Sequence, residues 1–528
     1  MKKIVIYDTT LRDGAQGEGV SFSGPGKIRV AKRLDQLGVD YIEGGFAASN
    51  PRDMAFFHEI RKEKLTHAKI AAFGSTRRAH VPVGEDVGVR ALLEAKTPVC
   101  TFFGKSWRLH VTDVLKVSEK EALAMIADTV RVLKEHGKEV VYDAEHFFDG
   151  YKDCPEFARA ALTAALNAGA DCLCLCDTNG GSLPHEIAAI TAEVIRAFPV
   201  RIGIHTHNDS DLAVANSLEA IRAGATHVQG TMNGYGERCG NANLCSIIPS
   251  LVLKTGHTCL REDSLKQLRE AALFVDEMAN LRPNSKAPYV GESAFAHKAG
   301  MHVDAVRKNP RSFEHVLPES VGNQRRILVS ELSGASNVFL KAVEMGLNLD
   351  KSAPEIKEIL RELERLEKEG YAFEAAEGSF KLLIQKVLKE HRPFFDLEGY
   401  RVIVEKRHKG EACISEATVK LTVNGKTVQT VGEGNGPVDA LDHALRSALL
   451  HFYPQIKGVH LTDYRVRILD PGEATAAKTR VVIESSDGET TWGTVGVSPN
   501  IIEASWEALV DGVEYKLFQE EKKAKKKA

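Results

Sequence analysis

The chain has 528 residues, 43% of them hydrophobic and 27% charged, with a formal net charge of −3 at pH 7. This length predicts two or three domains, each with its own core. The near-neutral charge gives no reason to expect a nucleic acid or an anionic membrane as partner. The sequence has no run of about 18 apolar residues, so it predicts no membrane span.

The N-terminal apolar run, residues 4–7, is followed at once by polar residues, which is typical of a first strand and not of a signal peptide. The nine cysteines form no CxxC pair, which predicts reduced thiols and a cytoplasmic location. Cys172, Cys174 and Cys176 alternate along one predicted strand. Such a trio suits either soft-metal binding or packing on one face of the strand, and we favour packing.

Residues 1–260 repeat one pattern, in which short apolar runs alternate with helix-like segments that often end in glycine. The runs begin near residues 3, 39, 69, 98, 139, 172, 201 and 227. Eight such units predict an α/β fold of the (β/α)₈ TIM-barrel type. An open doubly wound sheet is the alternative, but no GxGxxG follows the first strand.

Beyond the barrel, the sequence predicts two further regions and a tail. Residues 261–392 read as helical linker subdomains, including a charged helix at 354–369 and another at 336–346. Residues 393–518 read as a separate α+β domain, in which Asn-Gly at 424–425 marks a hairpin. The basic stretch 519–528 is expected to be a frayed, solvated tail.

Polar residues gather where the predicted barrel strands end. In a barrel those carboxyl ends converge on the face that carries active sites. The residues are Asp8, Asp13, Glu43, Glu145, Asp177, His205, His207 and Asn233.

His205 and His207 are two apart on the seventh strand, so both side chains point the same way. With Asp13 they form a facial set of two imidazoles and one carboxylate that leaves positions open on a divalent metal. Asn241, in the glycine-rich loop 234–244, is either a fourth ligand or a hydrogen-bonding group. The spacing does not choose between Mn²⁺, Mg²⁺, Zn²⁺ and Co²⁺.

An open-sided divalent ion beside Arg12 suits a 2-keto acid. The ion can chelate the keto oxygen and one carboxylate oxygen, while the guanidinium holds the remaining charge. Glu145, at the end of the fifth strand, is then a candidate base.

At this point the residues carry a family resemblance. "DTTLRDG" at 8–14, Glu145, "HTHND" at 205–209 and "GERCGNANL" at 236–244 together resemble the Asp-Arg-Glu TIM-barrel metal enzymes. That family includes the isopropylmalate, homocitrate and citramalate synthases and the hydroxymethylglutaryl-CoA lyases. "GESAFAHKAGMHVDAV" at 291–306 resembles the helical subdomain of the synthases, and 397–518 resembles their C-terminal regulatory domain.

The resemblance implies roles for single residues. Asp13, His205 and His207 would bind the metal with Asn241 nearby, Arg12 and Thr178 would hold the keto acid, and Glu145 and His302 would be catalytic. It also implies a Claisen-type reaction, in which acetyl-CoA loses a proton, attacks the keto carbon and has its thioester hydrolysed. One departure is Phe313, which stands where the synthases usually have a tyrosine.

The stretches "EGGFAASNPRD", "FFGKSWRLHVTDVL" and "YDAEHFFDGYKD" most resemble the long citramalate synthase branch. That branch joins pyruvate to acetyl-CoA for isoleucine synthesis, and Phe102, Phe103 or Trp107 could fill a pocket for so small a keto acid. The alternatives are an isopropylmalate synthase that uses 2-oxoisovalerate, an enzyme that runs in the lyase direction, and an amino-acid sensor without catalysis.

For the C-terminal domain we expect an isoleucine or leucine effector. The glycine-rich loop ahead of a helix, within 432–445, could hold its carboxylate at the helix N-terminus, or could be a simple strand-to-helix turn. The resemblance also implies a homodimer.

Overall fold

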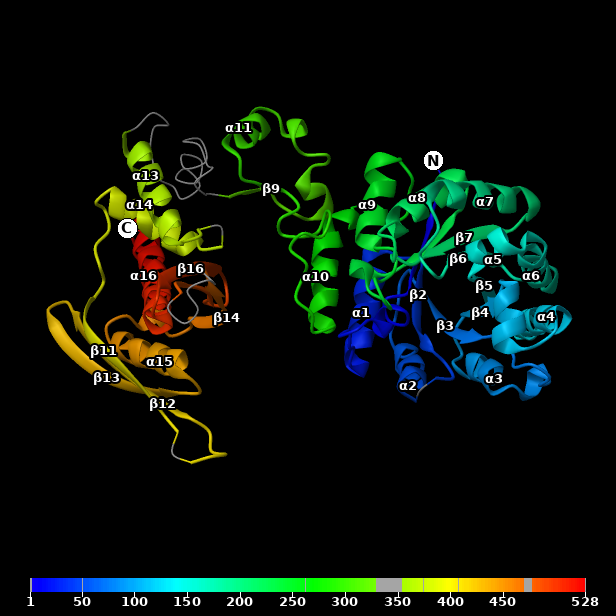
Figure 1. Ribbon diagram of the computed structural model, residues 1–528, viewed down its shortest axis with the longest axis horizontal. Helices are drawn as coiled ribbons and strands as arrows, with labels where there is room; N and C mark the ends of the chain where they lie inside the picture. The colour runs from blue at the N-terminus through cyan, green and yellow to red at the C-terminus, as the bar shows by residue number, and fades with distance from the viewer. Residues whose placement is uncertain are drawn as a thin grey trace. The chain divides into compact units, whose positions relative to one another are not determined.

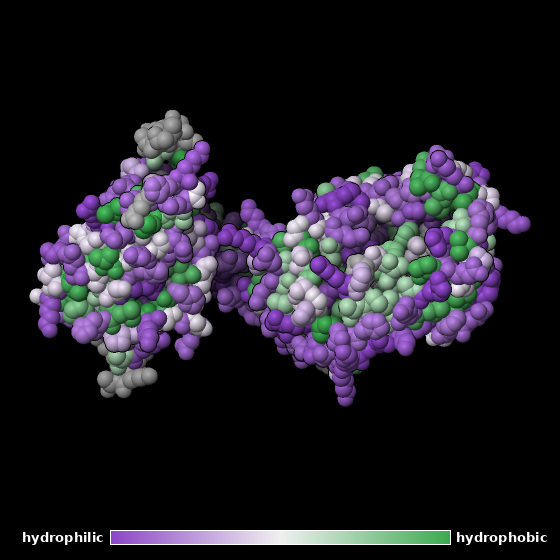
Figure 2. Space-filling model, turned by 90° about the horizontal axis from the view of Figure 1, so that it is seen from below, coloured by the Kyte–Doolittle hydropathy of each residue, from purple (hydrophilic) through white to green (hydrophobic). Residues whose placement is uncertain are grey.

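The computed structural model describes residues 2–49, 51–261, 263–328, 354–373, 375–406, 408–469 and 477–527 (Figure 1). The chain divides into two compact units. The first comprises Met1–Phe295 and His315–Arg325, and the second comprises Ala296–Glu314 and Arg326–Ala528. Hydrophilic residues cover most of each unit on the face in Figure 2, where hydrophobic residues gather in separate patches.

The first unit is a closed barrel of eight parallel strands in chain order, which confirms the predicted fold and excludes the open sheet. The strands are β1 (Val5–Asp8), β2 (Tyr41–Phe46), β3 (Lys69–Ser75), β4 (Val99–Lys105), β5 (Glu139–Glu145), β6 (Cys172–Asp177), β7 (Arg201–Thr206) and β8 (His227–Gly230).

Helices surround the barrel (Figure 1). They are α1 (Gly24–Leu37), α2 (Pro51–Ile60), α3 (Val87–Glu94), α4 (Glu119–Glu135), α5 (Phe147–Asp153), α6 (Pro155–Ala168), α7 (Pro184–Ala197), α8 (Ala213–Ala223), α9 (Leu244–Lys254) and α10 (Leu268–Met278). Their ends follow from local sequence. Ser23 caps α1 by accepting a hydrogen bond from the Gly26 amide, and Gly38 ends it with φ of 93°.

Side chains on alternate strand positions fill the barrel interior. Tyr7, Tyr41 and residues of β3 to β6 form one buried cluster there, which contains Cys172, Cys174 and Cys176. The packing interpretation of these cysteines therefore agrees with the structure. Cys174 and Cys176 also lie close to the carboxylate of Asp143.

The second unit contains β9 (Ala296–His297) and β10 (Arg326–Ile327), paired in parallel, with helix α11 (Gly300–Lys308) in the segment between them. Helices α13 (Pro354–Glu369) and α14 (Glu377–Val387) follow, and α13 has the bounds that the sequence predicts. The helix expected at 336–346 lies outside the described residues.

The C-terminal region contains two antiparallel three-stranded sheets, as an α+β domain requires. Helix α15 (Pro437–Leu450) packs on β12 and β13, and α16 (Ile501–Lys527) packs on β15 and β16. Asn424 and Gly425, both with positive φ, form the predicted hairpin turn between β12 and β13. The strands are β11 (Asp396–Glu405), β12 (Ile414–Val423), β13 (Lys426–Gly434), β14 (His460–Ile468), β15 (Thr479–Ser486) and β16 (Thr491–Ser498).

Helix α16 is longer than the sequence pattern indicates, because it continues through most of the stretch interpreted as a tail. Within the parts of the chain that the structure describes, neither this helix nor any other combines the length and apolarity that a membrane crossing needs.

Candidate metal centre and active site

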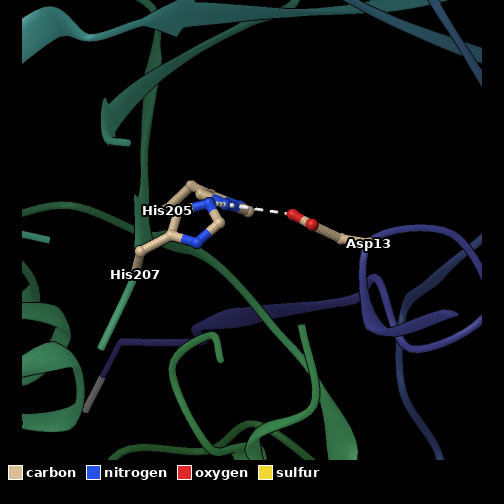
Figure 3. Close-up of side chains that lie close together, drawn as sticks. All are labelled: Asp13, His205 and His207. Atoms are coloured by element: carbon tan, nitrogen blue, oxygen red, sulfur yellow. Dashed lines mark hydrogen bonds and ion pairs between the residues drawn. The ribbon is translucent and has the colours of Figure 1, made fainter. Parts of the chain in front are cut away.

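Asp13, His205 and His207 come together at the end of the barrel, as the sequence predicts (Figure 3). One ligand atom from each residue lies within 4.8 Å of the other two, and all three residues are buried. His205 Nε2 is 3.3 Å from Asp13 Oδ2 and 3.3 Å from His207 Nε2. His205 is the penultimate residue of β7, and Asp13 lies in the turn after β1, so barrel closure brings the two segments together.

The charges around this cluster favour the protonation states that metal binding needs at Asp13 and His207. Burial alone would lower the pKa of His205, but the Asp13 carboxylate outweighs burial and raises it. Burial alone would raise the pKa of Asp13, but Arg12 and the two histidines outweigh burial and hold that pKa well below its usual range. Burial and the neighbouring His205 lower the pKa of His207 to about 3. Asp13 is therefore an anionic oxygen donor and His207 a neutral nitrogen donor at pH 7.

Asn241 supplies a further oxygen. Its backbone forms an isolated bridge with that of His207, and its Nδ2 donates to the Tyr235 carbonyl at 3.2 Å. Among the described residues, its buried Oδ1 has no hydrogen-bond partner. Two imidazoles, a carboxylate and an unused amide oxygen form a donor set that fits a divalent ion.

Arg12 is held rigidly beside the cluster. Its Nε donates to Glu43 Oε1 at 2.5 Å, its guanidinium lies 3.7 Å from the centre of the Phe73 ring, and its Nη1 is 3.4 Å from Asp13. The Tyr7 hydroxyl donates to the other Glu43 oxygen at 2.7 Å. The sequence placed Glu43 at a strand end without a role. The signal in the sequence that could have revealed its role is that Glu43 is a single acidic residue inside the apolar run of β2.

Glu145 forms an ion pair with Lys105, a residue that sequence reasoning missed. The two residues end β5 and β4 and stand opposite each other in the ladder between these strands. The Thr178 hydroxyl accepts a hydrogen bond from the His146 amide at 2.9 Å, which ties the loop after β6 to the end of β5.

Some predicted residues do not join this group. Asp8 accepts hydrogen bonds from Thr10, Asp177 accepts from Ser182, and Asn233 donates to Asp276. The hydrogen bonds of these three residues stabilise loops, although each residue ends or follows a strand.

His302 belongs to the second unit, on α11, where its ring stacks on Phe313 with centroids 4.2 Å apart. Phe102 packs into the layer between strands and helices, so it does not face the barrel interior. Phe103 stacks on Phe73, whose ring lies against the Arg12 guanidinium.

A groove of about 1250 Å³ extends from Arg12 between α1 and α2. Cations and aromatic rings line it, among them Lys27, Arg29, Arg52, Phe56 and Phe274, together with a smaller number of acidic residues such as Asp53.

A closed parallel barrel with this site is the architecture expected of a metal-dependent lyase or synthase barrel, and residues 3–275 match the HMGL-like family. Residues 289–370 match the homocitrate synthase post-HMGL domain-like family, and residues 374–517 match the LeuA allosteric (dimerisation) domain.

Relatives match over nearly the whole length. An (R)-citramalate synthase of Geobacter sulfurreducens is 54% identical, covering 99% of each chain. One of Aquifex aeolicus is also 54% identical, covering 98% of this chain and 99% of its own. A 2-isopropylmalate synthase of Methanocaldococcus jannaschii is 31% identical, covering 98% and 96%. The chain therefore belongs to the HMGL-like family, within its (R)-citramalate synthase branch, and the predicted resemblance is confirmed.

Proposed function

We propose that this protein condenses acetyl-CoA with pyruvate and hydrolyses the thioester, giving (R)-citramalate and CoA. The observation that carries the proposal is the Asp13, His205 and His207 cluster beside Arg12, in a chain 54% identical to (R)-citramalate synthases along its full length. As an acyltransferase of this kind it would serve isoleucine biosynthesis, and its free cysteines agree with a cytoplasmic location.

Asp13, His205 and His207 would hold the divalent ion, with Asn241 as a further oxygen ligand. When bound, the ion supplies positive charge to polarise the keto group. Arg12 would bind the pyruvate carboxylate through the guanidinium nitrogens that Glu43 leaves free, since Glu43 engages Nε. Thr178 would assist from the loop after β6.

Glu145 would move the proton of the acetyl methyl group. Its carboxylate forms an ion pair with Lys105, and a carboxylate is a group that can accept a proton. His302 would be the second proton-transfer group, contributed by the subdomain that contains α11. Phe313 stacks on its imidazole but has no proton to donate.

Acetyl-CoA would occupy the groove between α1 and α2, which begins at Arg12 and is large enough for a cofactor. Its cations suit the phosphates of CoA.

The C-terminal domain would carry the dimer contact and an isoleucine or leucine effector site. Packing against α15 explains why positions 432 and 434 are glycines, without any ligand. A Cβ atom on Gly432 or Gly434 would lie about 2.5 Å from the backbone of α15. The Asn435 amide at this helix N-terminus already donates to Asp439. The loop within 432–445 remains our candidate for the effector, and measuring activity with isoleucine and leucine tests it.

The test of the reaction is release of free CoA from acetyl-CoA with each of three keto acids, in the presence of Mn²⁺ or Mg²⁺. We expect turnover with pyruvate to exceed that with 2-oxoisovalerate and 2-oxoglutarate. Asp13→Asn should abolish it, because the substitution removes an anionic ligand.

Absence of thiol release with every keto acid would contradict the proposal. A preference for 2-oxoisovalerate would instead favour an isopropylmalate synthase. Cleavage of an acyl-CoA without condensation would favour the lyase direction.

A further inference from the structure

A chain of hydrogen bonds crosses the barrel interior behind the metal cluster. His205 Nδ1 lies 2.9 Å from Gln229 Oε1, and Gln229 Nε2 donates to Asp143 Oδ1 at 2.9 Å. All three residues are at most 5% exposed. Gln229 lies on β8, directly beside β7, whereas Asp143 belongs to β5 and reaches it across the interior.

The chemistry of the partners sets the direction of this chain. Burial raises the pKa of Asp143 to about 7, and above that pH its carboxylate only accepts. The Gln229 amide then turns its NH₂ group toward Asp143, as the structure has it. Its carbonyl oxygen then faces His205 and accepts a hydrogen bond from Nδ1–H. His205 Nε2 is left with a lone pair, and this is the nitrogen that faces Asp13 and His207.

The reversed amide would have the opposite effect. Its oxygen would face the Asp143 carboxylate, and its NH₂ group would face His205 Nδ1. The imidazole proton would then reside on Nε2, where it would block coordination.

We propose that Gln229, oriented by Asp143, is a positioning residue that keeps the His205 proton on Nδ1 and so presents Nε2 to the metal. The inference rests on the proposed function for the identity of the bound group. Outer groups of this kind orient ligands, and their removal typically weakens metal affinity about 10–100-fold.

The test uses the full-length chain stripped of metal and titrated calorimetrically with Mn²⁺. Gln229→Met keeps the side-chain volume but removes both hydrogen bonds, and should weaken Mn²⁺ binding about 10–100-fold. Asp143→Val leaves the Gln229 amide free to turn and should also weaken Mn²⁺ binding. Among the described residues, Asp143 donates or accepts no hydrogen bond with Asp13 or His207, so this effect would pass through Gln229.

Because both variants break the same chain, their effects should not add in the double variant. Cys172→Ala changes the same interior without touching this chain and should bind Mn²⁺ as the wild type does. At a pH above the raised pKa of His205, spectra of ¹⁵N-histidine-labelled protein should show the neutral Nδ1–H form in the wild type and a mixture of tautomers in Gln229→Met. Thermal unfolding of each metal-free variant reports whether it is folded. Gln229→Leu replaces Gln229→Met if the latter does not fold.

Equal Mn²⁺ affinity in the wild type and Gln229→Met would overturn the inference, and so would additive losses in the double variant. If the wild type condenses pyruvate while these variants bind Mn²⁺ normally, only this inference fails. A wild type that binds no Mn²⁺ would overturn both the inference and the proposed metal-dependent reaction.

Discussion

Arg12 shows how much of the site depends on single contacts that join different strands. Its guanidinium is fixed from three sides, by Glu43, by the Phe73 ring and by Asp13. Buried charges of this kind are stable only when every partner is present. The orientation of Arg12 toward a substrate therefore depends on Glu43 as much as on Arg12 itself.

We predict that Glu43→Gln lowers kcat/KM for pyruvate about 10–100-fold. The substitution exchanges an ion pair for a hydrogen bond from the guanidinium to a neutral amide, and hydrogen bonds to charged groups contribute about 1.5–3 kcal/mol. Steady-state kinetics measure the effect. Glu219→Gln, in an exposed pair with Arg222, is the control that should leave kcat/KM unchanged. Unaltered kinetics in Glu43→Gln would show that Arg12 does not need this partner.

At the residue scale, the sequence was sufficient to predict that Asp13, His205 and His207 lie together. Strand alternation puts both histidines on one side, and barrel topology puts Asp13 at the same end. The sequence was insufficient to predict that Gln229 and Lys105 belong to the site. Their importance depends on which side chains meet them across the barrel interior, and a one-dimensional pattern does not contain those distances.

Among the elements, the turn before β3 depends on one aspartate of α1. Asp35 is 4% exposed and accepts hydrogen bonds from the amides of Thr66, His67 and Ala68 and from the Thr66 hydroxyl. Burial alone would raise the pKa of Asp35, but these donors outweigh burial and lower it. Since the folded-state pKa lies below the unfolded one, the carboxylate stabilises the fold above the unfolded pKa, and this contribution is lost as pH falls through the folded pKa.

We therefore expect Asp35→Asn to destabilise the barrel unit by about 1–3 kcal/mol at pH 7, because an amide offers fewer acceptor sites than a carboxylate. The difference from the wild type should shrink as pH falls below about 4, the unfolded pKa of aspartate. Thermal unfolding at several pH values measures it. Asp113→Asn, at an exposed position, should behave as the wild type. A difference that stays constant down to pH 2 would contradict this account.

The elements themselves were largely predictable, since each barrel strand is a buried apolar run. Helix α16 was not. Its last residues are almost all charged, which by composition is typical of a solvated tail. In the structure, Glu520 pairs with Lys516 at 2.9 Å and with Lys523 at 3.1 Å, and such pairs at helical spacing extend the helix beyond its packed part.

At the scale of the whole molecule, the chain passes between the two units more than once. It leaves the barrel unit after Phe295, returns for His315–Arg325 and leaves again. The returning segment is anchored by Val321, which is fully buried, and by Asn323, whose Nδ2 donates at 2.9 Å to the carbonyls of Tyr289 and Gly291.

Asn323→Ala should lower the thermal midpoint of the barrel unit in the full chain, because it removes the Asn323 donor from the buried Tyr289 carbonyl and one of two donors from the Gly291 carbonyl. A buried carbonyl left without its donor costs about 1–3 kcal/mol. Asn309→Ala, in the intervening segment of the second unit, should leave that transition unchanged. Calorimetry of both variants checks the expectation. Equal midpoints would mean that the returning segment contributes nothing to barrel stability.

The distribution of the cysteines has a practical consequence. Of the nine, only Cys239 and Cys413 are exposed, and they belong to different units. Burial raises the pKa of Cys100 to about 11 and of Cys245 and Cys259 to about 12, which suppresses the reactive thiolates. Maleimide dyes should therefore label Cys239 and Cys413, one on each unit, faster than the half-buried Cys154. Energy transfer between the two dyes would then measure the distance between the two labelled positions without any engineered cysteine.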